Sequence, residues 1–236
     1  GRWSARIGGH ASDAPAILFV PPARVGLTRS QRVTAWFWAA ISALFLLQTI
    51  VGAAAEHYRA DLTSFFGFDL AGWFPYNLAR TWHVQLSLLW TAASFLAGGI
   101  FLAPFISGRE PRHQSRWVGV LFVAVCVVVF GSLGGEMLSI YGVSWAKGPL
   151  LGQQWEYLDL PRIFQAALTG GMFLWVFIIV RAIRGRLRTE SHGNLPWVFF
   201  FSALSIPAFY AVGMMARTGT HVTVAEFWRF WVVHLW

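Results

Sequence analysis

Long apolar runs separated by short polar links are the dominant pattern along this chain. Each run holds roughly twenty residues with few charges, the length that an α-helix needs to cross the hydrocarbon core of a membrane. Hydrocarbon offers no water to the backbone, so a spanning segment must satisfy its own hydrogen bonds, and a helix does so. The sequence therefore predicts an all-α integral membrane protein with five full transmembrane helices and the start of a sixth. We expect the spans at 32–55, 78–104, 117–140, 162–180 and 196–215, with the sixth beginning after 224.

The links between these runs carry recognisable start and turn signals. Thr28-Arg-Ser-Gln31 is typical of a helix N-terminus and predicts where the first span begins. The segment 56–78 is rich in aromatic and turn residues, which suits the membrane–water interface. Pro207 predicts a kink in the fifth span. We divide the chain into a polar, basic tail at 1–31 and one transmembrane core at 32–236.

Composition supports a lipid environment and excludes an ordinary soluble domain. The chain is 56% hydrophobic and 12% charged, and it holds 14 tryptophans and 21 phenylalanines. Its net charge of +8 comes without the motifs of a nucleic-acid-binding surface, so we expect membrane lipid as a partner and no nucleic acid. The single cysteine, Cys126, excludes an internal disulfide and is interpreted as a small buried apolar residue.

Lysine and arginine alternate in number from one link to the next. The tail has five, counting Arg32, and the links 105–116 and 181–195 have three and four. The links 56–80, 141–161 and 216–224 have two, one and one. Because basic residues accumulate on the cytoplasmic side of membrane proteins, residue 1 is predicted to be cytoplasmic. The three links with few basic residues then face the other side, together with most of the carboxylates.

Two histidines fall within predicted membrane helices. His83 lies about one turn into the second span, and His234 lies about two and a half turns into the sixth. On the sixth helix, Phe227, Phe230 and Trp231 share a face with His234. Neutral imidazole is the usual ligand for iron among helices, but a core histidine bonded to a neighbouring helix is the alternative. Spacing alone defines no metal site, because no His-x-x-x-His, Glu-x-x-His or Cys-x-x-Cys-His is present.

A family resemblance adds what spacing does not. The segment from Trp228 to Trp236, Trp-Arg-Phe-Trp-Val-Val-His-Leu-Trp, resembles the signature of the nitric oxide reductase branch of the haem–copper oxidase superfamily. Four further segments resemble that branch in the same order: 57–67, 80–86, 154–162 and 213–223. The first of these, His-Tyr-Arg-Ala-Asp followed by Phe-Phe-Gly, is similar to the quinol-dependent, single-subunit members.

The resemblance implies a role for several residues. His83 would be an axial ligand of a low-spin haem b. His234 would bind the non-haem iron, with a glutamate expected at position 238. Glu156 would lie near the haem propionates, where calcium binds or protons pass, and is the catalytic candidate. His57 and Asp61, four apart on one helical face, would edge the quinol pocket and accept its protons.

The implied reaction joins two nitric oxide molecules, two electrons and two protons into nitrous oxide and water. Its cofactors would be a low-spin haem b, a high-spin haem b, a non-haem iron and calcium, with quinol as electron donor. We expect a multi-pass protein of the bacterial cytoplasmic membrane, with a homodimer as its assembly. The sequence supplies part of the iron site, so we expect activity from the full-length protein and none from this piece alone.

Two alternatives remain open at this point. The first is the large subunit of a cytochrome c-dependent nitric oxide reductase, which would have no quinol site at His57 and Asp61. The second is a non-enzymatic polytopic transporter or assembly protein whose histidines are structural. The glycine pairs would be helix-packing contacts in either case: Gly98-Gly99, Gly134-Gly135 and Gly170-Gly171.

Overall fold

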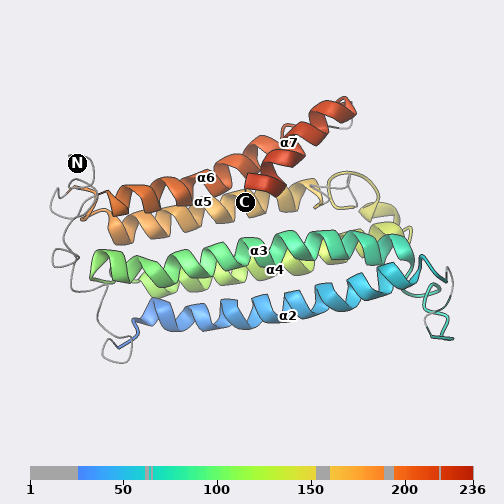
Figure 1. Ribbon diagram of the computed structural model, residues 1–236, viewed down its shortest axis with the longest axis horizontal. Helices are drawn as coiled ribbons and strands as arrows, with labels where there is room; N and C mark the ends of the chain where they lie inside the picture. Colours follow the sequence, from blue (N-terminus) through green and yellow to red (C-terminus); the bar gives the residue numbers. More distant parts are fainter. Residues whose placement is uncertain are drawn as a thin grey trace, which may run out of the picture.

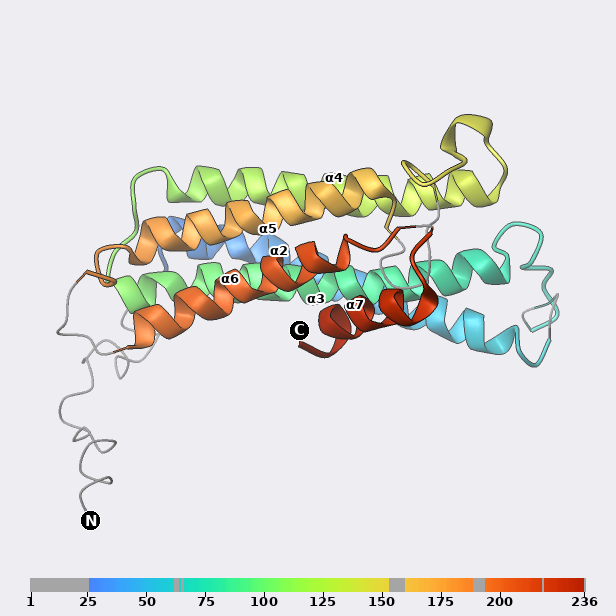
Figure 2. The same cartoon turned by 90° about the horizontal axis from the view of Figure 1, so that it is seen from above.

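α-Helices form almost all of the regular structure in the computed structural model, which describes residues 26–61, 64, 66–152, 160–188, 194–217 and 219–235. The elements are α2 (Arg29–His57), α3 (Tyr76–Ser107), α4 (Gln114–Ile140), the 3-10 turn η3 (Ser144–Ala146), α5 (Arg162–Ile183), α6 (Leu195–Gly213) and α7 (Val222–Leu235). Five long helices run side by side in alternating directions, and the last helix turns back beside the fifth of them, α6 (Figures 1 and 2).

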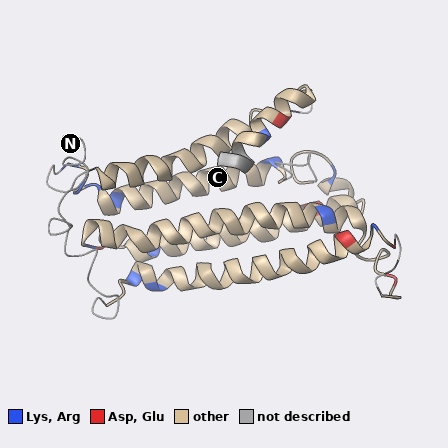
Figure 3. Cartoon of the chain, viewed as in Figure 1, with Lys and Arg blue, Asp and Glu red and all other residues tan. Residues whose placement is uncertain are grey.

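The helices α2 to α6 are each long and apolar enough to cross a membrane. This confirms the prediction of five full spans, and α7 is the predicted start of a sixth. On the long helices α2 to α6, charged residues lie mostly toward the two ends of the bundle (Figure 3). Which end faces the cytoplasm stays a prediction, as does the division into tail and core.

Local sequence explains where several helices start and stop. Thr28 Oγ1 accepts a hydrogen bond from the Gln31 backbone at 3.3 Å, and Gln31 Oε1 accepts one from the Thr28 backbone at 2.9 Å. This reciprocal cap confirms the predicted start of the first span. Pro75 precedes α3, and Gly108 ends it. The φ of Gly108 is 70°, a value that most other residues rarely adopt. α6 continues past Pro207 to Gly213, and the kink stays a prediction.

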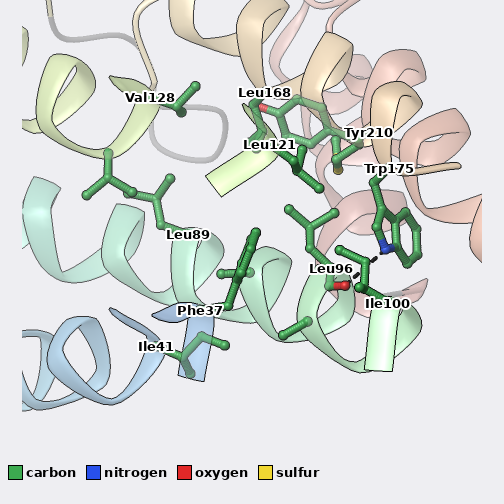
Figure 4. Packing of buried hydrophobic residues seen from close by; sticks show 14 of the residues in the cluster. Phe37, Ile41, Leu89, Leu96, Ile100, Leu121, Val128, Leu168, Trp175 and Tyr210 are labelled. Atoms are coloured by element: carbon green, nitrogen blue, oxygen red, sulfur yellow. Dashed lines mark hydrogen bonds between the residues drawn. The ribbon is translucent and has the colours of Figure 1, made fainter. Parts of the chain in front are cut away.

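Buried side chains from all five spans meet in one core. Phe37 of α2, Leu96 of α3, Leu121 of α4, Trp175 of α5 and Tyr210 of α6 are all less than 3% exposed (Figure 4). Trp175 Nε1 donates to the Leu96 carbonyl oxygen at 3.1 Å, which joins α5 to α3. Lipid tails are as apolar as these residues, so close packing and interhelical hydrogen bonds hold the bundle together rather than water exclusion.

Glycines allow close contacts with neighbouring residues, and the members of the predicted packing pairs differ in how tightly they are packed. A Cβ at Gly99 would lie 2.5 Å from Cζ2 of Trp175, so this glycine admits the indole ring. A Cβ at Gly135 would collide with the Leu151 carbonyl oxygen. Three of the remaining paired glycines meet no atom within 4 Å: Gly98, Gly134 and Gly170. In the first two pairs one glycine makes the tight contact and its neighbour does not, whereas a Cβ at Gly171 would meet only Leu121, at 3.9 Å.

Candidate functional site

His83 lies against the backbone of α2. Its Nδ1 is 3.0 Å from the carbonyl oxygen of Gln48, across the interface between α3 and α2. The ring rests on Gly52, one turn further along α2, where a Cβ would lie 2.5 Å from both Nδ1 and Cε1. Real Cβ atoms do not approach other atoms so closely, so glycine at this position makes room for the imidazole.

The bond to Gln48 fixes the protonation pattern of the ring. A carbonyl oxygen can only accept, so Nδ1 of His83 must carry the hydrogen and donate it. In the neutral imidazole, Nε2 then keeps its lone pair, and no hydrogen bond at Nε2 is present among the residues that the structure describes. A metal-binding histidine has this arrangement, with one nitrogen oriented by a carbonyl and the other available for iron. The residues present therefore fit a haem ligand at His83.

Gln48 is itself held in place by α3. Its side-chain Oε1 accepts a hydrogen bond from Trp90 Nε1 at 2.6 Å. The Trp90 ring also packs edge-on against Phe45, with centroids 5.4 Å apart. The same residue of α2 thus contacts α3 twice, through its backbone oxygen at His83 and through its side chain at Trp90. These contacts fix the rotation of α2 about its axis and so fix the surface on which the imidazole rests.

A buried carboxylate lies at the interface between α4 and α3. Glu136 of α4 and Gln85 of α3 are fully or almost fully buried, at 0% and 1% exposure. Gln85 Nε2 donates to Glu136 Oε1. Gln85 is two residues beyond His83, so its side chain leaves α3 on a different face, and this polar pair joins α3 to α4. Glu136 had no predicted role, although a carboxylate inside an apolar span is a signal of function.

The proposed quinol-pocket residues lie at the end of α2, in a geometry that differs from the prediction. α2 ends at His57, so His57 and Asp61 do not share the face of a continuous helix. A further turn follows, in which the Asp61 N–H donates to the His57 carbonyl oxygen at 3.0 Å. The Asp61 carboxylate accepts from the N–H and from the hydroxyl of Ser64. The His57 ring meets Phe66, with centroids 5.0 Å apart.

Tyr58 anchors the loop between α2 and α3, which we call the aromatic loop, beside these two residues. It is 1% exposed, and its hydroxyl donates to the Phe74 carbonyl oxygen. Burial, and then the charges of Asp69 and Tyr141, raise the pKa of Tyr58, so the hydroxyl keeps its proton. Three rings of the loop remain more than two-thirds exposed: Phe66, Phe68 and Trp73. Such a loop suits the membrane interface that the sequence predicted.

The remaining candidates are only partly described. Glu156 lies outside the described residues, and so does the side chain of His234, whose backbone belongs to α7. On the predicted aromatic face of α7, Trp231 packs against Phe227 at 6.0 Å and against Phe209 of α6 at 5.4 Å. His221 had no predicted role, and its Nδ1 accepts from the Thr223 N–H at 3.3 Å at the start of α7.

A comparison with known protein families identifies a match over most of the chain. Residues 32–236 match the family described as cytochrome c and quinol oxidase polypeptide I. The match covers α2 from Arg32 onward and all of α3 to α7. It confirms the expected haem–copper oxidase fold. The family description includes cytochrome c and quinol as electron donors and does not include nitric oxide.

Proposed function

Because this chain belongs to the cytochrome c and quinol oxidase polypeptide I family, we propose that it forms part of the core of a quinol-oxidising nitric oxide reductase. Membership of this family makes the chain part of a multi-pass membrane oxidoreductase of the haem–copper oxidase superfamily. One observation carries the proposal furthest: His83 has Nδ1 bonded to Gln48 and Nε2 available as an iron ligand. The choice of nitric oxide rests on the signature segments at 80–86 and 228–236.

In this proposal His83 holds the low-spin haem b through Nε2. That haem supplies one-electron transfer when bound, while the protein orients its ligand. Gln48 keeps the hydrogen on Nδ1, which leaves Nε2 basic, and Gly52 sets the ring close to α2. His234 would bind the non-haem iron, and Glu156 would hold calcium or pass protons.

His57 and Asp61 would receive the protons that quinol loses. Quinol oxidation releases two protons with two electrons, so a base near each hydroxyl lowers the barrier. Ser64 holds the Asp61 carboxylate in place, and Phe66 packs against the imidazole of His57. The exposed rings of the loop suit an amphipathic quinone ring that reaches the site from the lipid. These contacts support a quinol site at the end of α2.

The purified full-length protein, supplied with quinol and nitric oxide without oxygen, is expected to make one nitrous oxide for every two nitric oxide molecules consumed. Gas chromatography of the headspace and a nitric oxide electrode measure the two quantities. Boiled protein and protein without quinol provide the controls. If the protein consumed oxygen with quinol and left nitric oxide unchanged, the proposed reaction would be wrong and an oxygen-reducing member of the family would be indicated.

Asp61→Asn and His57→Gln are each expected to slow quinol-driven turnover by about a hundredfold, because general-base catalysis typically contributes that much. Turnover driven by a small artificial electron donor should stay near the wild-type rate, since that donor bypasses the quinol site. Glu56→Gln is the matched control, because Glu56 is neighbouring but exposed and paired with Arg59. Equal losses with both donors, or no loss with quinol, would exclude the pocket and favour the cytochrome c-dependent alternative.

A further inference from the structure

Arg181, near the end of α5, lies against two aromatic rings. Its guanidinium carbon is 5.9 Å from the centroid of Trp117 in α4 and 5.7 Å from that of Phe177 in α5. The two rings meet edge-to-face, with centroids 5.8 Å apart. Trp117 is 39% exposed and Phe177 is 48% exposed, so the ring pair forms part of the outer surface of the bundle. The cation is therefore held at the surface by cation–π contacts.

The hydrogen bonds of this guanidinium are incomplete. Nη2 donates to the Arg112 carbonyl oxygen at 2.9 Å. Nη1 is buried and has no hydrogen-bond partner among the residues that the structure describes. A guanidinium carries five N–H donors in a planar fork that matches carboxylate and phosphate oxygens. A buried donor without an acceptor is costly, so the arrangement favours a ligand that supplies one.

The surroundings of Arg181 are basic. Three further arginines are exposed: Arg112 on the link between α3 and α4, Arg116 near the start of α4, and Arg184 directly after α5. Within the described part of the chain, the ion pairs are Arg59–Glu56 at the other end of the bundle and Arg229–Glu226 on α7. Glu110 is the described carboxylate on the link between α3 and α4, and it accepts from the Ser30 N–H. An anion from outside the described residues would balance this charge.

Exposed apolar residues continue from Trp117 and Phe177 along α4 and α5, in the direction away from Arg181. We call them the apolar track. Phe173 lies one turn before Phe177 on α5, and Val120 lies about one turn after Trp117 on α4. Both are exposed, at 44% and 54%. A free phosphate ion would gain nothing from such a surface. An acyl chain attached to the anion would cover it.

We propose that Arg181 binds the phosphate of an anionic phospholipid, with Trp117 and Phe177 flanking the headgroup and the first part of an acyl chain on α4 and α5. The proposal needs only the membrane-spanning bundle and does not rest on the reaction assigned above. Arginine pairs with phosphate oxygens through its fork, and basic sites between membrane helices are suited to acidic headgroups.

Native mass spectrometry of the full-length protein, offered equal amounts of phosphatidylglycerol and phosphatidylcholine, tests the site. Wild-type protein is expected to retain the anionic lipid about fivefold more, the effect of about one basic residue at a membrane surface. Arg181→Gln should lower this ratio close to one, and Arg181→Lys should give an intermediate ratio because it keeps the charge without the fork. Arg29→Gln, an exposed arginine where α2 begins, is the matched control and should keep the wild-type ratio.

Three outcomes would overturn the proposal. If Arg181→Gln kept the enrichment, or if Arg29→Gln lowered it equally, diffuse charge attraction would explain the lipid preference. Inorganic phosphate distinguishes the two sources of the anion, because excess phosphate is expected to leave the bound lipid in place. Displacement of the lipid by phosphate would show that the site recognises the free ion and that the apolar track does not contribute. Trp117→Leu is a second variant, and it should lower lipid retention while Arg181 is still present.

Discussion

Replacement of His83 by alanine in the full-length protein is expected to remove the low-spin haem signal almost completely while the protein still inserts into the membrane. Alanine offers no lone pair to iron, and no group of three or more His, Cys, Asp or Glu residues that could hold a metal lies among the described residues. The variant also removes the hydrogen bond between His83 Nδ1 and the Gln48 carbonyl oxygen. The reduced-minus-oxidised optical spectrum of purified protein measures the haem, and immunoblotting of washed membranes measures insertion.

His221→Ala is the matched control for this variant. His221 is exposed, and its contact is a bond to the backbone at the start of α7, so its loss should leave the spectrum unchanged. An unchanged spectrum in His83→Ala would contradict the ligand assignment. His83 would then be a core histidine bonded to a neighbouring helix, which was the alternative reading of the sequence.

Gly52→Val is expected to lower the low-spin haem content strongly, although residue 52 offers no ligand itself. Even the first side-chain carbon would lie 2.5 Å from two atoms of the His83 ring, so the imidazole or the helix must move. Gln48 and Trp90 tie α2 to α3 one turn away, which resists a helix shift. Overpacking of this kind costs about 1–3 kcal/mol. Haem content per protein and the electron paramagnetic resonance spectrum of the oxidised protein measure the result.

The control for this variant is Gly98→Val. Gly98 also lies within a membrane helix, but a Cβ there would meet no atom within 4 Å. It should therefore bind haem at the wild-type level. Equal haem contents in the two variants would mean that the contact between the imidazole and α2 does not position the ligand.

The spans could be predicted because their signal is length and hydrophobicity, which need no knowledge of neighbours. The predicted ends of the spans differ by a few residues from the observed helix ends, because local hydrogen bonds extend the helices. α2 continues to His57, two residues beyond the prediction, and α3 begins at Tyr76, directly after Pro75. A polar residue in the last turn, such as Glu56, suggests an end to a membrane span. It does not end the helix, because the backbone bonds continue into water.

The candidate site could be predicted only in part. His83 stands out by residue type in an apolar run, and the resemblance gave it a role. Its partner is a backbone carbonyl oxygen, which every residue of α2 carries, so no side-chain pattern could indicate Gln48. Gly52 is one of many glycines in apolar runs. Helices that are apolar all round carry little information about which face meets which neighbour, and this contact depends on that choice.

The relation between His57 and Asp61 was predicted wrongly for a different reason. A spacing of four places two residues on one helical face only where the helix continues. Here Asp61 accepts hydrogen bonds from Ser64, and aspartate and serine readily compete with helical bonds in this way. The turn at 58–60 replaces the regular helix, while one bond between the backbones of His57 and Asp61 preserves their proximity.

α2 is a single rigid helix that contacts both the proposed quinol pocket and the proposed haem ligand. Gly52, on which the imidazole of His83 rests, and His57, at the edge of the proposed quinol pocket, are separated by roughly 7.5 Å along the helix axis. Because an α-helix barely stretches, a shift of His57 along the axis would carry Gly52 and the Gln48 carbonyl with it. Binding of a molecule in the pocket and the position of the His83 imidazole would then be mechanically linked, because less than two turns of stiff helix separate the two sites.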